Sequence, residues 1–378
     1  MNPALVLFFT RGVSLRTWSM LGMLDREVAL YKRLCRWGFD VSFVTYGDAR
    51  DREYEARLEG IRVLCNTEDL PLDDYEKELS SGHGCELQRA HVFKTNQTYG
   101  SEVALLAARL FGKPLVARCG YMWSKNAERE HGYASCQATE ARRVEEKVFA
   151  AADHVVVTTD AMRLDIAGRI PAAASKVSVI PNYVDTDMFR PLNRARDRNM
   201  LLFVGRIAME KNLESLLEAV EPLDAKVVLI GEGRLRPELQ VRFGSSDGRV
   251  TWEGNVPNST LPEYFSRIGL FVLPSLYEGH PKVLIEAMSC GTPVLGADSP
   301  GIRELINHGQ TGYLCSTDTM SIRSSITDLL AQPQLCDTLG LNARRFVLDH
   351  YSLNRIAEIE AALLLDLIRR EERTNRVG

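Results

Sequence analysis

Short apolar runs alternate with amphipathic stretches along almost the whole chain of 378 residues, and this alternation limits the possible folds. Apolar runs rich in β-branched residues predict strands, and apolar residues that repeat every three or four positions predict helices. Strands are expected at Ala4–Phe9, Val41–Thr45, Ile61–Leu64, His91–Lys94, Pro114–Arg118, His154–Thr158, Val177–Ile180, Met200–Val204, Lys226–Ile230, Val250–Glu253, Leu270–Leu273, Pro293–Gly296 and Thr311–Leu314. Helices are expected between most of them, for example at Leu24–Trp37, Val103–Phe111, Glu140–Ala151, Leu213–Val220, Lys282–Met288, Ser321–Leu330 and Leu353–Ile368. This pattern is typical of parallel sheets covered on both faces, so the sequence predicts an α/β fold.

The length of the chain indicates two domains, because 378 residues exceed what one ordinary hydrophobic core holds. The alternation stops between 181 and 198, where two prolines and several charges stand without periodicity. We therefore expect an N-terminal Rossmann-like domain over 1–180, a linker over 181–198 and a second doubly wound domain over 199–350. Two such domains would face each other across a cleft at the carboxyl ends of their strands, where ligands bind.

A C-terminal helix over 351–378 is expected to cross back to the first domain, because its apolar side must pack on another part of the chain. Its expected apolar stripe consists of Ile356, Ile359, Leu363, Leu364 and Ile368.

Composition excludes several classes of protein. The net charge of −4 lacks the basic excess of a protein that coats nucleic acid, so no nucleic-acid partner is expected. The first apolar run, Ala4–Phe9, is far shorter than the ~20 residues that span a bilayer. The eight cysteines form no C-x-x-C pair, so we expect reduced thiols in a cytoplasmic protein and neither a zinc knuckle nor a redox dithiol.

The loop after the expected strand Met200–Val204 combines a glycine with two cations. Gly205 lets the backbone approach a ligand closely, and Arg206 and Lys211 follow just before a helix. Fixed cations beside the positive end of a helix suit a diphosphate. The alternative is a solvated pair of cations on a surface turn.

A second loop follows the expected strand Leu270–Leu273 and leads into a helix with a carboxylate. Pro281 fits the first turn of that helix, and the N–H groups nearby would form an anion-binding end. Glu286 lies among apolar residues, where an unpaired charge is costly. A vicinal diol such as a ribose is a suitable partner, whereas a structural ion pair or an exposed position is the alternative.

The residues of these two loops, taken together, resemble a known family. Phe271–Ile306 is similar to the pattern P-S-x-x-E-G-x-P-x-V-x-x-E-A-M-x-x-G-x-P-V of the retaining glycosyltransferases of family 4, which have the GT-B fold. The segment from Gly205 to Asn212 resembles their V-G-R-x-x-x-E-K-N, and Ile180–Phe189 resembles their interdomain linker. The matches cover most of 177–315 in order, whereas 1–176 match loosely.

The resemblance implies a sugar-nucleotide donor, a UDP-, GDP- or ADP-sugar, held mainly by the second domain and without a required cofactor or metal. By this resemblance the catalytic residues are Arg206, Lys211 and Glu278, the two cations neutralising the leaving diphosphate. The donor-binding residues are Gly12, Gly205, Gly231, Gly279, His280, Pro281, Val283, Leu284 and Glu286. The acceptor is a glycan or a lipid-linked molecule, as in the biosynthesis of surface polysaccharides or glycoconjugates.

The chain departs from the family pattern in the first domain. Arg11-Gly12-Val13 stands where the family has a pair of glycines. Many family members have a histidine after the strand that corresponds to Leu115–Arg118, but Arg118–Trp123 contains none here, so no catalytic base is assigned. Asp185-Thr186-Asp187 has the spacing of a metal-binding D-x-D, but within the linker we expect Asp185 to cap a turn.

Three segments of the first domain are candidates for contacts with the acceptor or with a membrane. Ser14–Leu24 mixes apolar residues with arginines, which leaves open a peripheral contact with the inner face of a membrane. The alternative is the buried face of the first helix. Lys94–Thr98 and Tyr121–Lys125 are expected to present polar groups to the acceptor.

Three other functions remain open at this point. One is a GT-B sugar-nucleotide epimerase, another a phosphorylase that needs pyridoxal phosphate, and the third a sugar-nucleotide-binding subunit without turnover. Each would be distinguished by its reaction or by its lack of one.

Overall fold

The computed structural model describes residues 2–244 and 248–377, and these fold into two compact units. The first unit contains the described residues of Met1–Met20, Glu27–Pro181 and Ile356–Gly378. The second contains Leu21–Arg26 and the described residues of Asn182–Arg355. The short segment Leu21–Arg26 therefore departs from the expectation that 1–180 forms one continuous block.

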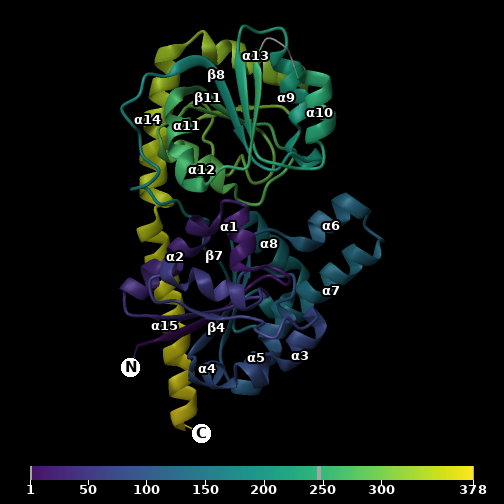
Figure 1. Cartoon of the computed structure of the whole chain (residues 1–378), viewed down its shortest axis with the longest axis vertical. Helices are drawn as coiled ribbons and strands as arrows, with labels where there is room; N and C mark the ends of the chain where they lie inside the picture. Colours follow the sequence, from purple (N-terminus) through teal and green to yellow (C-terminus); the bar gives the residue numbers. More distant parts are fainter. Residues whose placement is uncertain (1, 245–247, 378) are drawn as a thin grey trace. The chain divides into compact units, whose positions relative to one another are not determined.

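A seven-stranded parallel sheet forms the first unit, with the strand order β3-β2-β1-β4-β5-β6-β7. Its strands are β1 (Ala4–Phe8), β2 (Asp40–Val44), β3 (Arg62–Leu64), β4 (Val92–Thr95), β5 (Leu115–Cys119), β6 (His154–Val157) and β7 (Val177–Val179). The connecting helices are α1 (Leu15–Met20), α2 (Leu24–Arg36), η1 (Ala49–Arg57), α3 (Leu72–Gly82), α4 (Gly84–Arg89), α5 (Glu102–Phe111), α6 (Trp123–His131), α7 (Cys136–Ala151), α8 (Asp160–Arg169) and η2 (Pro171–Ala173). Figure 1 shows this alternation of strands and helices along the chain.

A six-stranded parallel sheet forms the second unit, with the order β10-β9-β8-β11-β12-β13. Its strands are β8 (Asp197–Val204), β9 (Lys226–Ile230), β10 (Val250–Gly254), β11 (Ile268–Leu273), β12 (Val294–Ala297) and β13 (Tyr313–Cys315). Its helices are η3 (Met209–Lys211), α9 (Leu213–Val220), α10 (Arg236–Phe243), η4 (Asn258–Thr260), α11 (Leu261–Arg267), α12 (Lys282–Ser289), α13 (Thr319–Leu330) and α14 (Pro333–His350).

The structure confirms the expected α/β fold with parallel sheets. Every run expected to be a strand is one, although β8 begins at Asp197, inside the segment expected to be linker.

Several helices begin where a side chain satisfies free N–H groups of the first turn. Ser135 accepts a hydrogen bond from the N–H of Ala138, and Asp318 accepts one from Ser321.

The C-terminal helix α15 (Leu353–Val377) differs from the expected pattern on its buried side. Ile356 and Leu364 are buried as expected, but Ile359 is 39% exposed and Glu360 is buried in its place. Glu360 is buried because it forms an ion pair with Lys94 of β4, which is fully buried. Lys94 was expected to face an acceptor, and this expectation is wrong because its charge is already used inside the first unit.

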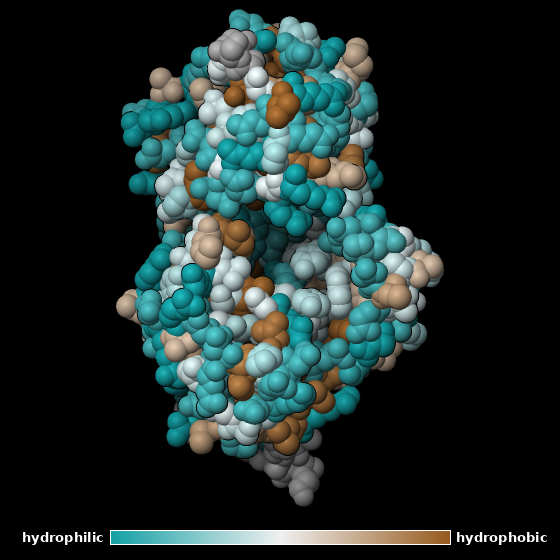
Figure 2. Space-filling view, turned by 45° about the vertical axis from the view of Figure 1, so that its right-hand side comes forward, coloured by the Kyte–Doolittle hydropathy of each residue, from teal (hydrophilic) through white to brown (hydrophobic). Residues whose placement is uncertain are grey.

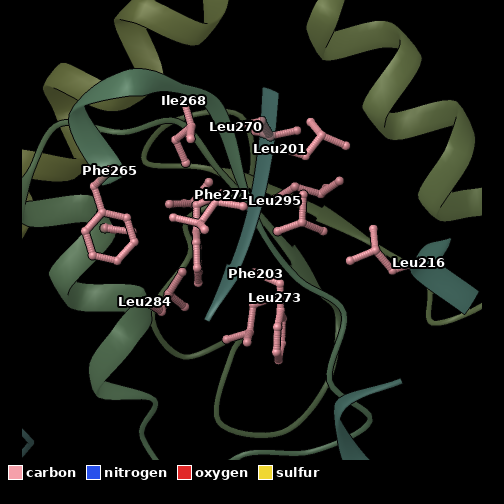
Figure 3. Close-up of a cluster of buried hydrophobic side chains, with 14 of the residues drawn as sticks. Leu201, Phe203, Leu216, Phe265, Ile268, Leu270, Phe271, Leu273, Leu284 and Leu295 are labelled. Atoms are coloured by element: carbon pink, nitrogen blue, oxygen red, sulfur yellow. The ribbon is translucent and has the colours of Figure 1, made fainter. Parts of the chain in front are cut away.

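Apolar residues from both faces of the second sheet make one continuous core. Figure 3 shows part of it, with Phe265 of α11 and Leu284 of α12 beside Phe271 of β11. The rings of Phe265 and Phe271 meet edge to face with centroids 5.6 Å apart. Leu284 is fully buried, so this packing holds α12 against the sheet and fixes the loop that precedes it.

On the face drawn in Figure 2, hydrophobic residues lie singly or in small groups. In the segment Ser14–Leu24, Leu15, Trp18 and Leu24 are buried, which agrees with a helix face packed on the core, while Met20 and Leu21 are exposed. Within the described part of the chain, no helix combines the length and the apolar character needed to cross a bilayer.

Candidate functional site

The two loops singled out in the sequence follow neighbouring strands at the centre of the second sheet. Strand order runs outward from β8 through β9 to β10 on one side, and from β11 through β12 to β13 on the other. The chain direction of the connections therefore reverses between β8 and β11. In open parallel sheets, ligands bind beside the carboxyl ends of the strands at such a switch point. Residues 205–212 and 274–281 leave β8 and β11 at this place.

The loop after β8 is held by close backbone contacts that only glycine permits. The N–H of Gly205 donates to the carbonyl of Ile230 at 2.9 Å, and the N–H of Gly231 donates to Gly254 at 2.7 Å. Gly231 has a φ of +135°, and a Cβ added there would lie 1.9 Å from the carbonyl oxygen of Gly205. Any side chain at 231 would therefore push the two loops apart.

Lys211 and Glu278 bring the two loops together in one ion pair. Lys211 Nζ lies 2.6 Å from Glu278 Oε1, and their side chains are 14% and 12% exposed. The backbone supports this contact, because the N–H of Leu276 donates to the carbonyl of Glu210 at 2.9 Å. The pair is therefore fixed between the loops and still reaches the surface.

Arg206 lies apart from this pair. Its side chain is 78% exposed, and its guanidinium contacts Glu210 at 2.9 Å. An exposed ion pair of this kind contributes little to stability, so Arg206 is available to a ligand at small cost.

The loop from 278 to 281 is held by residues 300–301, which follow β12, and by Asn182 of the linker. The N–H of Glu278 donates to Pro300 at 2.9 Å, and Gly301, with a φ of +84°, has no room for a Cβ beside the carbonyls of Glu278 and Gly279. Asn182 Nδ2 donates to the carbonyl of His280 at 2.6 Å. The backbone of the loop is thus held at three places.

Helix α12 begins at Lys282, as expected, with Pro281 at the N-cap rather than inside the first turn. No side chain caps this end, and the N–H of Leu284 donates to the carbonyl of Pro281 at 3.2 Å. The Leu284 N–H is therefore already used within the first turn. The resemblance implies that the N–H groups of Val283 and Leu284 contact the phosphates. Among the described residues, that of Val283 has no backbone acceptor and is therefore free to do so.

Glu286 is a buried carboxylate with one oxygen satisfied and one not. The residue is 1% exposed. Oε1 accepts a hydrogen bond from Asn258 Nδ2 at 3.0 Å and lies 3.5 Å from Nη1 of Arg26. Oε2 has no hydrogen-bond partner among the described residues. Burial, with the Glu286 charge as a second cause, raises the pKa of the Cys290 thiol, so Cys290 stays neutral beside Glu286.

The sequence missed three residues that hold this site: Arg26, Asn182 and Asn258. Asn182 stood inside the segment Ile180–Phe189 that resembles the family's linker, whereas Asn258 belonged to no motif singled out in the sequence. Arg26 lies 260 positions from Glu286, so no local spacing indicates their contact.

Gly12 lies in the first unit, at the carboxyl end of β1. Its φ of +75° is the left-handed conformation that favours glycine. Next to it, Arg11 is paired with Asp73 and Glu76 of α3.

Asp185 caps a turn, as expected. Its Oδ1 accepts hydrogen bonds from the N–H groups of Asp187 at 3.0 Å and Met188 at 3.2 Å. Over 2–244 and 248–377, no group of three or more His, Cys, Asp or Glu side chains is placed to hold a metal ion.

A separate hollow of about 630 Å³ lies between β13 and α13 in the second unit. It is lined by residues that include His308, Tyr313, Ser321 and Asp328, and none of the predicted site residues lines it.

Comparisons with known proteins point to one family. Residues 28–188 match the sequence model of Glycosyltransferase Family 4, and residues 184–346 match that of Glycosyl transferases group 1. The D-inositol 3-phosphate glycosyltransferase of Thermomonospora curvata is 28% identical, over 86% of this chain and 86% of its own length. The alpha-D-kanosaminyltransferase of Streptomyces kanamyceticus is 29% identical, over 56% of this chain, which matches only 60% of that relative.

Solved structures share the fold. Sucrose-phosphate synthase from Thermosynechococcus elongatus superposes with a TM-score of 0.83 at 21% identity, covering 98% of this chain and 100% of that one. Anabaena Alr3699/HepE in complex with UDP and glucose superposes with a TM-score of 0.74 at 18% identity, covering 95% of this chain and 98% of that one.

Proposed function

Because the chain belongs to the family 4 glycosyltransferases of the GT-B fold, we propose that it transfers a hexose-type sugar from a nucleoside-diphosphate sugar to a hydroxyl group. The acceptor is a glycan, a glycolipid or another hydroxyl compound, and the sugar keeps its anomeric configuration. The donor is a UDP-, GDP- or ADP-sugar, and the UDP in the similar Anabaena structure supports the first of these.

One observation carries the proposal: Glu286 is buried and ionisable, and its Oε2 has no hydrogen-bond partner among the described residues. A buried carboxylate oxygen without a partner is costly unless a ligand supplies a donor. The 2′,3′-hydroxyls of a ribose supply such donors. The Lys211–Glu278 pair at the neighbouring loop would then meet the diphosphate and the sugar of the same molecule.

The residue roles follow the charge that develops during transfer. Lys211 and Arg206 stabilise the leaving diphosphate, assisted by the backbone N–H of Val283 at the start of α12. Glu278 and the backbone of Gly279, His280 and Pro281 bind hydroxyls of the transferred sugar. Gly205, Gly231 and Gly12 allow backbone to approach the donor closely.

In the transfer step, the bond between the anomeric carbon and the phosphate oxygen breaks while the acceptor oxygen bonds to that carbon from the same face. The released phosphate oxygen takes the proton of the acceptor hydroxyl, so the step needs no protein base. The two cations carry the neutralisation of the diphosphate, and we expect EDTA to leave activity largely unchanged.

Acceptor binding is assigned to the first unit. Tyr99 and Trp123 form an edge-to-face pair with ring centroids 5.0 Å apart, and Tyr99 is 39% exposed. Tyr121, at the end of β5, is 37% exposed. Aromatic faces of this kind suit a sugar ring or the apolar part of a lipid-linked acceptor.

The proposed location is the cytoplasm, because the eight cysteines are free thiols. The exposed side chains of Met20 and Leu21 would provide a peripheral contact with the inner face of the membrane.

A thermal-shift panel tests the proposal. UDP, GDP, ADP and their sugars are compared with inorganic phosphate and free glucose, because a ligand that binds the native state raises the melting temperature. One nucleoside diphosphate should stabilise the protein while phosphate alone does not. No shift with any nucleotide would contradict the proposal. Conversion of the donor to its epimer without acceptor would identify an epimerase instead, and binding without turnover a non-catalytic subunit.

A further inference from the structure

We propose that Arg26 positions Glu286 for the nucleotide, so that the segment Leu21–Arg26 is part of the donor site of the second unit. This inference rests on the proposed function, because it takes Glu286 as the group that binds the ribose. Arg26 belongs to the first turn of α2, far from the donor-site motifs in the sequence.

The segment is anchored to the second unit through Gly22. The carbonyl of Gly22 accepts a hydrogen bond from the N–H of Asn258 at 2.9 Å. Gly22 has a φ of +69°, and a Cβ added there would lie 2.5 Å from the carbonyl oxygen of Val256. The backbone therefore approaches the loop after β10 as closely as only glycine allows.

Arg26 itself is held at both its backbone and its side chain. The hydroxyl of Tyr183 donates to the carbonyl of Arg26 at 2.7 Å, and Tyr183 is 7% exposed. Nη1 of Arg26 lies 3.5 Å from Oε1 of Glu286, and the arginine side chain is 20% exposed. The cation is thus directed at the carboxylate from a fixed backbone.

Asn258 connects these contacts. Its backbone N–H binds Gly22, and its side-chain Nδ2 donates to Glu286 Oε1 at 3.0 Å. Arg26 and Asn258 therefore meet the same carboxylate oxygen, and the other oxygen, Oε2, which has no hydrogen-bond partner in the described part of the chain, is left for a ligand.

This arrangement has a physical consequence for binding. Removing the cation leaves a buried carboxylate whose remaining partner, among the residues that the structure describes, is the amide of Asn258, and this is unfavourable. The carboxylate then relaxes away from the orientation in which Oε2 accepts a hydroxyl proton donor. The ribose contact is lost, while contacts with the base and the diphosphate remain.

The alternative is an ion pair that serves stability alone. The positioning role and the purely structural role of Arg26 predict different results. Loss of a purely structural pair changes the melting temperature but leaves the ratio of affinities for ribose and 2′-deoxyribose nucleotides unchanged.

Calorimetric titration separates these possibilities. UDP, GDP and ADP are each compared with the 2′-deoxy counterpart on the wild-type chain, and the pair that binds is used for the variants. A hydroxyl bonded to a carboxylate is expected to give the wild type a preference for the ribose form of at least about tenfold. In Arg26→Ala we expect affinity for the ribose form to fall by about tenfold and the preference to shrink below about threefold.

Matched variants complete the experiment. Glu286→Ala should abolish the preference, and Arg26→Lys, which keeps the charge, should retain part of it. Arg36→Ala is the control, since Arg36 lies on the same helix in an exposed pair with Glu59. Tyr183→Phe removes only the hydroxyl that binds the Arg26 carbonyl. If Arg26→Ala does not fold, Tyr183→Phe and Arg26→Lys test the proposal in its place, and both should prefer the ribose form less than the wild type does.

The outcomes are distinct. If the wild type binds none of the nucleotides, the proposed function fails. If it binds them without preference for ribose, Glu286 is not the ribose ligand and the inference fails with that assignment. If the wild type prefers ribose and Arg26→Ala and Tyr183→Phe prefer it equally, the inference alone is overturned.

Discussion

Under the proposed function, Lys211 and Glu278 are the two residues that exchange each other for new partners when a donor binds. In the structure they form an ion pair, with Lys211 Nζ 2.6 Å from Glu278 Oε1, and both side chains are mostly shielded from solvent. A diphosphate offers Lys211 a stronger partner, and a sugar hydroxyl offers Glu278 a donor. The pair therefore keeps both side chains in place while the site holds no donor.

Lys211→Ala tests this role. The diphosphate gains charge as the glycosidic bond breaks, so Lys211 should act more on the transition state than on the bound donor. We expect kcat to fall by about 100-fold or more, with a smaller change in affinity for the nucleoside diphosphate. Steady-state kinetics and calorimetry measure the two. Lys226→Ala, in an exposed pair with Asp197, is the control. Equal losses in kcat and affinity would mean that Lys211 only holds the ground state.

His154 sets a dependence of stability on pH. Burial, and secondarily the Arg370 guanidinium, lower the pKa of His154 below its ordinary 6.5. Below that ordinary value the unfolded chain therefore binds more protons than the folded one, and the free energy of unfolding falls as pH decreases. The melting temperature should drop between pH 7 and pH 5.5, and less so in His154→Asn than in the exposed-site control His131→Asn. Identical drops would contradict the assignment.

At the residue scale, the sequence predicted which types of side chain occupy the loops 205–212 and 274–281 and the start of α12, but not the partners of these side chains. Glu286 was expected to need a partner because it lies in an apolar stretch, and it is buried beside Arg26 and Asn258. The identity of these partners depends on contacts between distant segments, which local spacing does not encode. For Lys94 the sequence led to a wrong prediction: the side chain was expected to face an acceptor, but it is buried in the core and paired with Glu360.

At the scale of elements, strands were easier to predict than helices. A buried parallel strand is continuously apolar, so all of them were visible in the sequence. Helix α14 was not among the expected helices, and its start at Pro333 carries no side-chain cap. In α15, hydrophobicity alone placed Ile359 inward, whereas the helical period places Glu360 there with Lys94 as its partner.

The Lys94–Glu360 pair is the element-scale prediction. Removing one member leaves the other charge buried and unpaired, so Lys94→Met should destabilise the chain by about 3–5 kcal/mol. Lys94→Met combined with Glu360→Leu should recover most of this loss, because two apolar side chains can replace a buried pair. Denaturant unfolding measures both variants. A double variant as unstable as the single one would show that the charge itself is not the cause.

At the scale of the whole molecule, the order of strands decides where chemistry is placed. The loops 205–212 and 274–281 follow the strands beside the switch point of the second sheet, β8 and β11. The topology therefore places the loops that carry Lys211 and Glu278, and the helix that carries Glu286, after two neighbouring strands, although the three residues are spread over 76 positions. The hollow between β13 and α13 lies at the edge of that sheet and uses none of these residues.

Amide hydrogen exchange across the entire chain, with and without the nucleoside diphosphate found by thermal shift, tests the central claim most directly. The account predicts slower exchange at 205–212, at 278–286 and at 22–26, because bound ligand orders these loops and the segment that carries Arg26. Protection limited to 313–328, around the hollow at the edge of the second sheet, with unchanged exchange in the donor loops, would contradict it.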